Sequence, residues 1–132
     1  MTSEILLLLV EDEPLISLAA HDALEAGGFT LVMAEDGDQA MKVLESRHQQ
    51  LSGLITDVRL GSGPSGWDVA RLAREVKPDL PVVYTTGDSA HEWTAQGVPN
   101  SVMVQKPYAP AQLTTAISTL LTRADTGSHP MP

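Results

Sequence analysis

The chain contains no cysteine and few aromatic residues. Without cysteine it can form neither a disulfide framework nor a thiolate metal site, which fits the reducing cytoplasm. Two tryptophans, two tyrosines and one phenylalanine leave the core to aliphatic side chains. The longest apolar run, residues 5–10, is too short to span a membrane or to serve as a signal peptide. We therefore expect a cytoplasmic protein that does not contact a membrane.

Basic residues are also scarce. Eight lysines and arginines face 17 aspartates and glutamates, for a formal net charge of −9. A chain this acidic is a poor match for nucleic acid, and it suits basic partners or a carboxylate site that binds a cation. Its 132 residues, 42% of them hydrophobic, fit one globular domain.

Short apolar runs alternate with helical repeats along the chain. Strands are expected at residues 5–10, 29–34, 54–57, 80–85 and 101–105. Helices are expected at residues 14–26, 37–47, 65–77 and 110–123, with a weak helical segment at 88–96. This alternation predicts an α/β fold, a parallel sheet covered by helices on both faces. Residues 1–123 form this domain, and residues 124–132, which lack periodicity, are predicted to be a flexible tail.

In the first helix, one apolar stripe is predicted to face the core. It consists of Leu15, Leu18, Ala19, Ala23 and Ala26, and Ile16, Ala20 and Leu24 widen it.

Polar residues follow four of the five strands, at the point where each strand ends. In parallel α/β sheets these carboxyl ends share one edge, which is where such folds place their sites. The residues brought there are Glu11, Asp12, Asp57, Thr86 and Lys106.

Three carboxylates at one edge would repel one another unless a cation lay between them. Mg2+ takes oxygen ligands and binds through one or two carboxylates. Zinc and copper favour His and Cys ligands, and neither residue type is near these strand ends in the sequence. A carboxylate such as Asp57 can also accept a phosphoryl group. Phosphoryl transfer needs positioning and charge neutralisation, which Mg2+ and the Lys106 ammonium would supply.

At residues 4–122 the chain resembles a receiver domain of a two-component response regulator. The segments that carry the resemblance are Leu9-Val10-Glu11-Asp12-Glu13-Pro14, Thr56-Asp57-Val58-Arg59, Val83-Tyr84-Thr85-Thr86-Gly87 and Val104-Gln105-Lys106-Pro107-Tyr108. The resemblance implies a doubly wound, flavodoxin-like (βα)5 three-layer sandwich with strand order 2-1-3-4-5. It also implies a signalling protein that switches by phosphorylation and assists its own phosphorylation and dephosphorylation, not an enzyme with a separate substrate.

Residue roles follow from the resemblance. Asp57 would be the phosphoacceptor. Mg2+ would be held by Asp12, by Asp57, by Glu11 directly or through water, and by the backbone carbonyl of Arg59. Thr86 would bond the phosphoryl group and turn inward, and Lys106 would pair with the phosphate. The peptide bond from Lys106 to Pro107 is expected to be cis.

Three departures from the family pattern stand out. Met103 occupies the position where an aromatic side chain usually reports activation. The loop after Asp57 is longer than in the chemotaxis regulators and is rich in Gly and Ser. The segment 84–89 partly resembles the Phe-Ala-Thr-Gly-x-Tyr motif of the FATGUY single-domain receivers, a group that also lacks the usual aromatic.

Because no output domain fits after residue 122, we expect a stand-alone receiver, a monomer or weak dimer. The resemblance implies that it takes phosphate from a histidine kinase or a histidine phosphotransfer protein. It would then contact an unidentified protein target or pass phosphate on. The kinase contact is expected around the first helix and the output around the fourth and fifth helices, with residues 88–96 as the mobile element. Trp67 and Trp93 are expected to pack inside, although Trp93 could instead anchor a partner.

Three alternatives stay open. The chain could be a pseudo-receiver that works without phosphorylation, the receiver part of a hybrid histidine kinase, or a Mg2+-dependent phosphatase. The phosphatase is disfavoured because Glu11-Asp12-Glu13 does not place two aspartates one residue apart.

Overall fold

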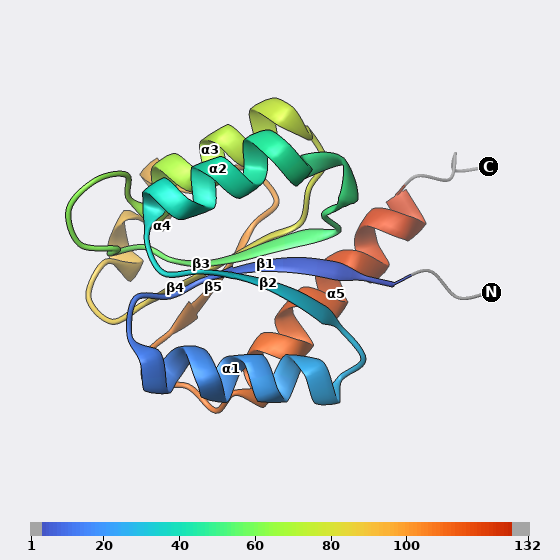
Figure 1. Ribbon diagram of the computed structural model, residues 1–132, viewed down its shortest axis with the longest axis horizontal. Coiled ribbons are helices and arrows are strands. Elements are labelled where there is room, and N and C mark those ends of the chain that lie inside the picture. The colour runs from blue at the N-terminus through green and yellow to red at the C-terminus, as the bar shows by residue number, and fades with distance from the viewer. Residues whose placement is uncertain (1–3, 128–132) are drawn as a thin grey trace.

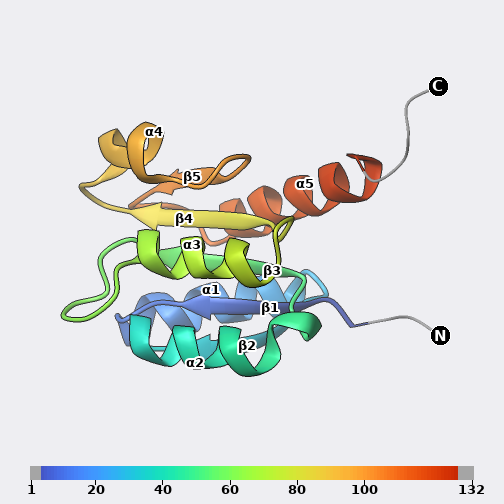
Figure 2. The same cartoon turned by 90° about the horizontal axis from the view of Figure 1, so that it is seen from above.

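The computed structural model describes residues 4–127 as one α/β sandwich. Five parallel strands lie side by side in the order β2-β1-β3-β4-β5 (Figure 2). Helices α2 and α3 cover one face of the sheet and α1 and α5 the other (Figure 1). The flavodoxin-like fold and its strand order are therefore confirmed.

Most element boundaries lie close to their predicted positions. The strands are β1 (Leu6–Val10), β2 (Thr30–Ala34), β3 (Gly53–Asp57), β4 (Val82–Thr86) and β5 (Val102–Gln105). The helices are α1 (Pro14–Ala26), α2 (Gly37–Arg47), α3 (Gly66–Val76), α4 (Trp93–Gln96) and α5 (Ala111–Gly127), with 3-10 turns η1 (His48–Gln50) and η2 (Ala90–Glu92). Side-chain caps begin two of these helices: Asp36 accepts the Gln39 N–H at α2, and Ser65 and Asp68 cap each other's backbone N–H groups at α3.

The sheet divides an aliphatic core into two layers, because successive side chains of a strand point to opposite faces. In β1, Leu8 and Val10 pack toward α2 and α3, while Leu7 and Leu9 pack toward α1 and α5. A strand buried on both faces must be apolar throughout, which explains the uninterrupted run in the sequence.

The predicted inward stripe of α1 is wrong at Leu15 and Leu18 but right at Ala20 and Leu24, which were expected only to widen it. Leu15 and Leu18 are 83% and 58% exposed, whereas Ala20 and Leu24 are fully buried against the sheet. Apolar residues occur on more than one side of this helix, so its sequence fits two orientations. Packing against α5 and the sheet selects the orientation that leaves an apolar face uncovered.

The ladder between β4 and β5 sets Tyr84 opposite Met103. Tyr84 is fully buried and packs on Trp67, with their ring centroids 4.7 Å apart. Trp93 is half-buried and its Nε1 donates to Ser101 Oγ at 2.9 Å. Both tryptophans therefore pack as expected, and Trp93 is not an exposed anchor.

Two segments differ in extent from the predictions. The weak helix at residues 88–96 consists of the turn η2 followed by the four residues of α4. Helix α5 continues to Gly127, four residues beyond the predicted end of this helix, and the rest of the predicted tail lies outside the described residues. None of the helices within residues 4–127 has the length and apolar character needed to cross a membrane.

Candidate functional site

The candidate site lies at the carboxyl edge of the sheet, where the chain leaves four neighbouring strands. Glu11 and Asp12 follow β1, Asp57 and Thr86 end β3 and β4, and Lys106 follows β5. The five side chains predicted for the site thus lie at this edge, and Arg59, predicted for its backbone carbonyl, follows Asp57 by two positions. Glu11, Asp57 and Thr86 are buried, Lys106 is partly buried, and Asp12 is exposed.

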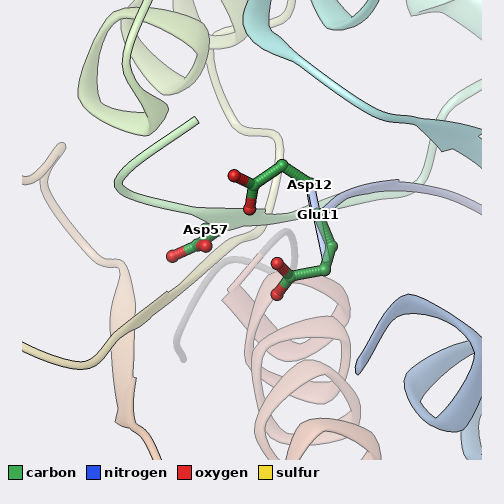
Figure 3. Close-up of side chains that lie close together, drawn as sticks. All are labelled: Glu11, Asp12 and Asp57. Carbon is green, nitrogen blue, oxygen red and sulfur yellow. The ribbon is translucent and has the colours of Figure 1, made fainter. Parts of the chain in front are cut away.

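Three carboxylates converge at the centre of the edge. Glu11, Asp12 and Asp57 each present one oxygen, and these oxygens lie within 4.8 Å of one another. Figure 3 shows the three carboxylates close together, with Asp57 beside Glu11 and Asp12. An all-oxygen donor set with one exposed member fits Mg2+, which keeps several of its waters when protein binds it.

Lys106 connects two of these acids. Its Nζ lies 3.0 Å from Asp57 Oδ2 and 3.1 Å from Glu11 Oε1. Burial raises the pKa of Glu11 to about 7, and the nearby Asp57 charge adds to this effect. Burial also raises the pKa of Asp57, although the hydrogen bond from Lys106 opposes the shift. A single ammonium therefore does not fully compensate the two buried acids, and the site favours a further positive charge.

Thr86 bonds the chain that follows it. Its Oγ1 accepts the backbone N–H of Ser89 at 2.9 Å, and Ser89 is 1% exposed. Its backbone carbonyl accepts the N–H of Lys106 at 2.8 Å. A movement of the Thr86 side chain would therefore act directly on the loop between β4 and η2. The peptide bond between Lys106 and Pro107 is cis, as predicted.

One contact at the edge was not predicted. Arg59 Nε donates to Asp88 Oδ1 at 2.8 Å, which joins the loop after β3 to the loop after β4. Each residue lies two positions after the strand-end residue of its own strand. Because β3 and β4 are neighbours, the opposite charges at these matching offsets were the signal that could have revealed the pair. Both side chains are exposed, so the pair contributes little to stability.

The sheet order and the residues at its edge agree with the comparison to known protein families. The family model for the response regulator receiver domain matches residues 7–118. The chain belongs to this family. Receiver domains bind Mg2+ at an acidic cluster and interact with histidine kinases or phosphotransfer proteins. In this chain the acidic cluster consists of Glu11, Asp12 and Asp57.

Solved receivers resemble this one along nearly their whole length. A response regulator receiver protein from Sinorhizobium medicae is 38% identical, with a TM-score of 0.89 over 92% of this chain and 98% of its own. The receiver of a sensor histidine kinase from Pseudomonas aeruginosa is 21% identical, with a TM-score of 0.77 over 91% of this chain and 99% of its own. That second structure holds a magnesium ion in its active site cleft.

The similar curated proteins are longer. The phosphate regulon regulator PhoB of Escherichia coli is 31% identical over 89% of this chain and 52% of its own length. The sensor kinase CckA of Brucella abortus is 27% identical over 89% of this chain but only 13% of its own length. The receiver therefore spans about half of one relative and a small part of the other.

Proposed function

We propose that this receiver is a phosphorylation switch in which Asp57 accepts a phosphoryl group from a phosphohistidine. The observation that carries the proposal is the placement of the buried Asp57 carboxylate between two further acids and the Lys106 ammonium. Such a site offers both a nucleophile and groups that neutralise the charge of a phosphoryl group. The switch assists its own phosphorylation and dephosphorylation and has no separate substrate.

The transfer assigns one role to each side chain. An Asp57 oxygen forms a bond to phosphorus as the bond between phosphorus and the donor imidazole breaks, and the imidazole leaves with that electron pair. Lys106, already 3.0 Å from Asp57, pairs with a phosphoryl oxygen. The Thr86 hydroxyl donates to another.

Glu11, Asp12, Asp57 and the carbonyl of Arg59 are the groups that would hold Mg2+. The ion, when bound, neutralises charge on the transferring phosphoryl group. The three clustered carboxylates fit it, because their negative charge exceeds what Lys106 compensates.

Mg2+ is expected to stabilise the protein more at pH 8 than at pH 5.5. The pKa of Glu11 is raised in the folded state to about 7. Its contribution to stability is therefore complete below the unfolded pKa and is lost as the pH rises through 7. Above pH 7 the charged Glu11 needs a cation, and below pH 6 a proton replaces it. Thermal unfolding with and without Mg2+ at both values measures the effect.

In Glu11→Gln this pH dependence of the Mg2+ effect should shrink, because the titrating group is gone. An equal rise in Tm at both pH values in the wild-type protein would contradict the assignment of Glu11.

The partner contact is proposed on the uncovered face of α1. Leu15 is 83% exposed and borders a cavity of about 430 Å3. The cavity lining continues from α1 to the candidate site and consists of Leu15, Ile16, Ala19, Lys106, Pro107, Tyr108 and Pro110. An apolar surface that reaches Lys106 suits a partner helix that delivers its phosphohistidine to Asp57.

Leu15→Asp is expected to slow phosphotransfer from a histidine kinase or phosphotransfer protein about 30-fold or more, as for loss of an apolar interface anchor. Because this side chain lies outside the acidic cluster, phosphorylation by acetyl phosphate should change less than twofold. The two rates, measured side by side, separate docking from chemistry. Equal losses with both donors would contradict a docking role.

The remaining steps of the signal follow from this proposal. Phosphorylation changes contacts with a protein target, or the chain passes its phosphate on. A pseudo-receiver would bind its partner without phosphate, and a receiver belonging to a hybrid kinase would receive phosphate within a larger protein.

One experiment tests the proposed function against its rivals. The protein is incubated with acetyl phosphate and either Mg2+ or EDTA, and its intact mass and the released phosphate are recorded. One phosphoryl adduct that requires Mg2+ supports the switch. No adduct with acetyl phosphate or with any phosphohistidine donor supports the pseudo-receiver, and rapid turnover of phosphate esters supports the phosphatase.

A further inference from the structure

We propose that Arg71 and Arg74 of α3 form a clamp that holds the connection from α4 to β5 in its present position and thereby opposes phosphorylation of Asp57. The inference rests on the proposed function and concerns the regulation of the same site. The clamp is defined here as the two guanidinium groups with the groups that they bond.

Both arginines reach from α3 to the connection. Arg71 Nη2 donates to the side-chain and backbone oxygens of Gln96, the latter at 3.3 Å. Arg74 Nη1 donates to the carbonyl of Pro99 at 2.6 Å, and its Nε donates to the carbonyl of Leu80 at 2.7 Å. Two side chains one helical turn apart thus fasten both ends of the stretch from residue 96 to 99.

The connection has little regular structure of its own. Helix α4 has four residues, so few backbone hydrogen bonds hold this region. Its inner side is held by side chains instead: the Tyr84 hydroxyl accepts the N–H of Val98 at 3.0 Å, and Ser101 Oγ donates to the carbonyl of Val98 at 2.7 Å. A segment fastened by a few side chains can change position without unfolding the sheet.

The segment of residues 89–99 is held by the clamp at its carboxyl end, and its amino end is attached to the candidate site through Ser89. Thr86 Oγ1 accepts the N–H of buried Ser89. When Thr86 turns its hydroxyl toward a phosphoryl group on Asp57, that N–H must follow or lose its acceptor, and a buried N–H without an acceptor is costly. Residues from Ser89 onward are therefore pulled by Thr86 while the clamp holds Gln96 and Pro99.

Met103 stands where an aromatic side chain usually reports activation, so the signal from Thr86 needs another path. The aromatic neighbour in this part of the ladder is Tyr84, which lies opposite Met103 and is fully buried with its hydroxyl bonded. A buried, bonded ring cannot swing between inner and outer positions. The coupling therefore runs through the backbone of residues 89–99 and ends on α3.

Thermodynamic linkage makes the clamp measurable. A contact that is stronger in the unphosphorylated state must weaken phosphoryl binding by the same factor. Arg71→Ala should therefore bind beryllofluoride with Mg2+, a phosphoryl analogue, about fivefold more tightly than the wild-type protein. Amide hydrogen exchange at residues 96–101 should be faster in the free variant, and Gln96→Ala should shift both quantities in the same direction by less.

Arg47→Ala is the matched control. Arg47 ends α2 and its Nε donates to Gln50 Oε1 at 3.0 Å, so the variant loses a similar exposed bond far from the connection. Its beryllofluoride affinity should equal that of the wild-type protein. Arg71 and Gln96 are both exposed, so folding of their variants is not at risk.

Three results would overturn the clamp. Faster exchange in Arg71→Ala with unchanged beryllofluoride affinity would make the contact merely structural. Weaker beryllofluoride binding in this variant would assign the contact to the phosphorylated state. If the wild-type protein binds no beryllofluoride and takes no phosphoryl group, the proposed function fails and the clamp with it, whereas failure of the clamp alone leaves wild-type binding intact.

Discussion

Asp57→Asn should take up no phosphoryl group under conditions in which the wild-type protein gains one. The amide keeps the size and shape of the carboxylate but lacks its nucleophilic charge. The other acids of the cluster, Glu11 and Asp12, should not replace it, because the proposed function assigns them to Mg2+ and not to the phosphoryl group. Intact mass after incubation with Mg2+ and acetyl phosphate measures the outcome, and Asp57→Ala should behave in the same way.

Asp57→Asn is also expected to raise the Tm of the Mg2+-free protein at pH 8. Burial raises the pKa of Asp57, so its charged form is disfavoured in the folded state at this pH. Asn removes that charge from the neighbourhood of Glu11. Asp79→Asn, an exposed carboxylate between α3 and β4, is the control and should retain the adduct. An adduct that persists in Asp57→Asn would refute Asp57 as the acceptor.

Lys106→Ala should slow phosphorylation by acetyl phosphate about 100-fold, the effect typical of removing one group that stabilises charge in a transition state. Lys106 Nζ is the only cationic group within 4.0 Å of Asp57 or Glu11 among residues 4–127. Without it, two buried carboxylates face each other, and the approach of an anionic donor becomes less favourable. The rate constant for adduct formation at saturating Mg2+ measures the effect.

Two further variants sharpen this result. Lys106→Arg keeps the charge in a wider group and should recover part of the rate. Lys42→Ala removes an exposed lysine from α2 and should leave the rate unchanged. If Lys106→Ala is phosphorylated at a rate within twofold of the wild-type rate, Lys106 acts only in packing.

The sequence by itself determined the sheet and its working edge. A buried parallel strand needs apolar side chains on both faces, so the run in β1 could be recognised without coordinates. The strand ends could also be predicted, because the change from apolar to polar residues occurs where the chain leaves the sheet. The convergence of Glu11, Asp12 and Asp57 then followed from parallel topology, since the carboxyl ends of such strands share one edge.

Tertiary structure alone decided which side of α1 is covered. The helix carries apolar residues around much of its circumference, so periodicity favoured a stripe with Leu15 and Leu18 as core residues, whereas packing buried only its predicted margin at Ala20 and Leu24. The free energy of burial depends on the partner surface as well as on the helix, and a single sequence does not display that surface.

The bonds that tie the site to its surroundings were likewise decided by tertiary structure. Arg71 meets Gln96, Arg59 meets Asp88 and Tyr84 meets Val98, each across at least 14 positions in the chain. Propensities and periodicities report only local preferences, and such contacts depend on how separate elements pack together. The sequence placed the reactive side chains at the edge of the sheet, and the packing of α3, α4 and β5 determined which segment those side chains can displace.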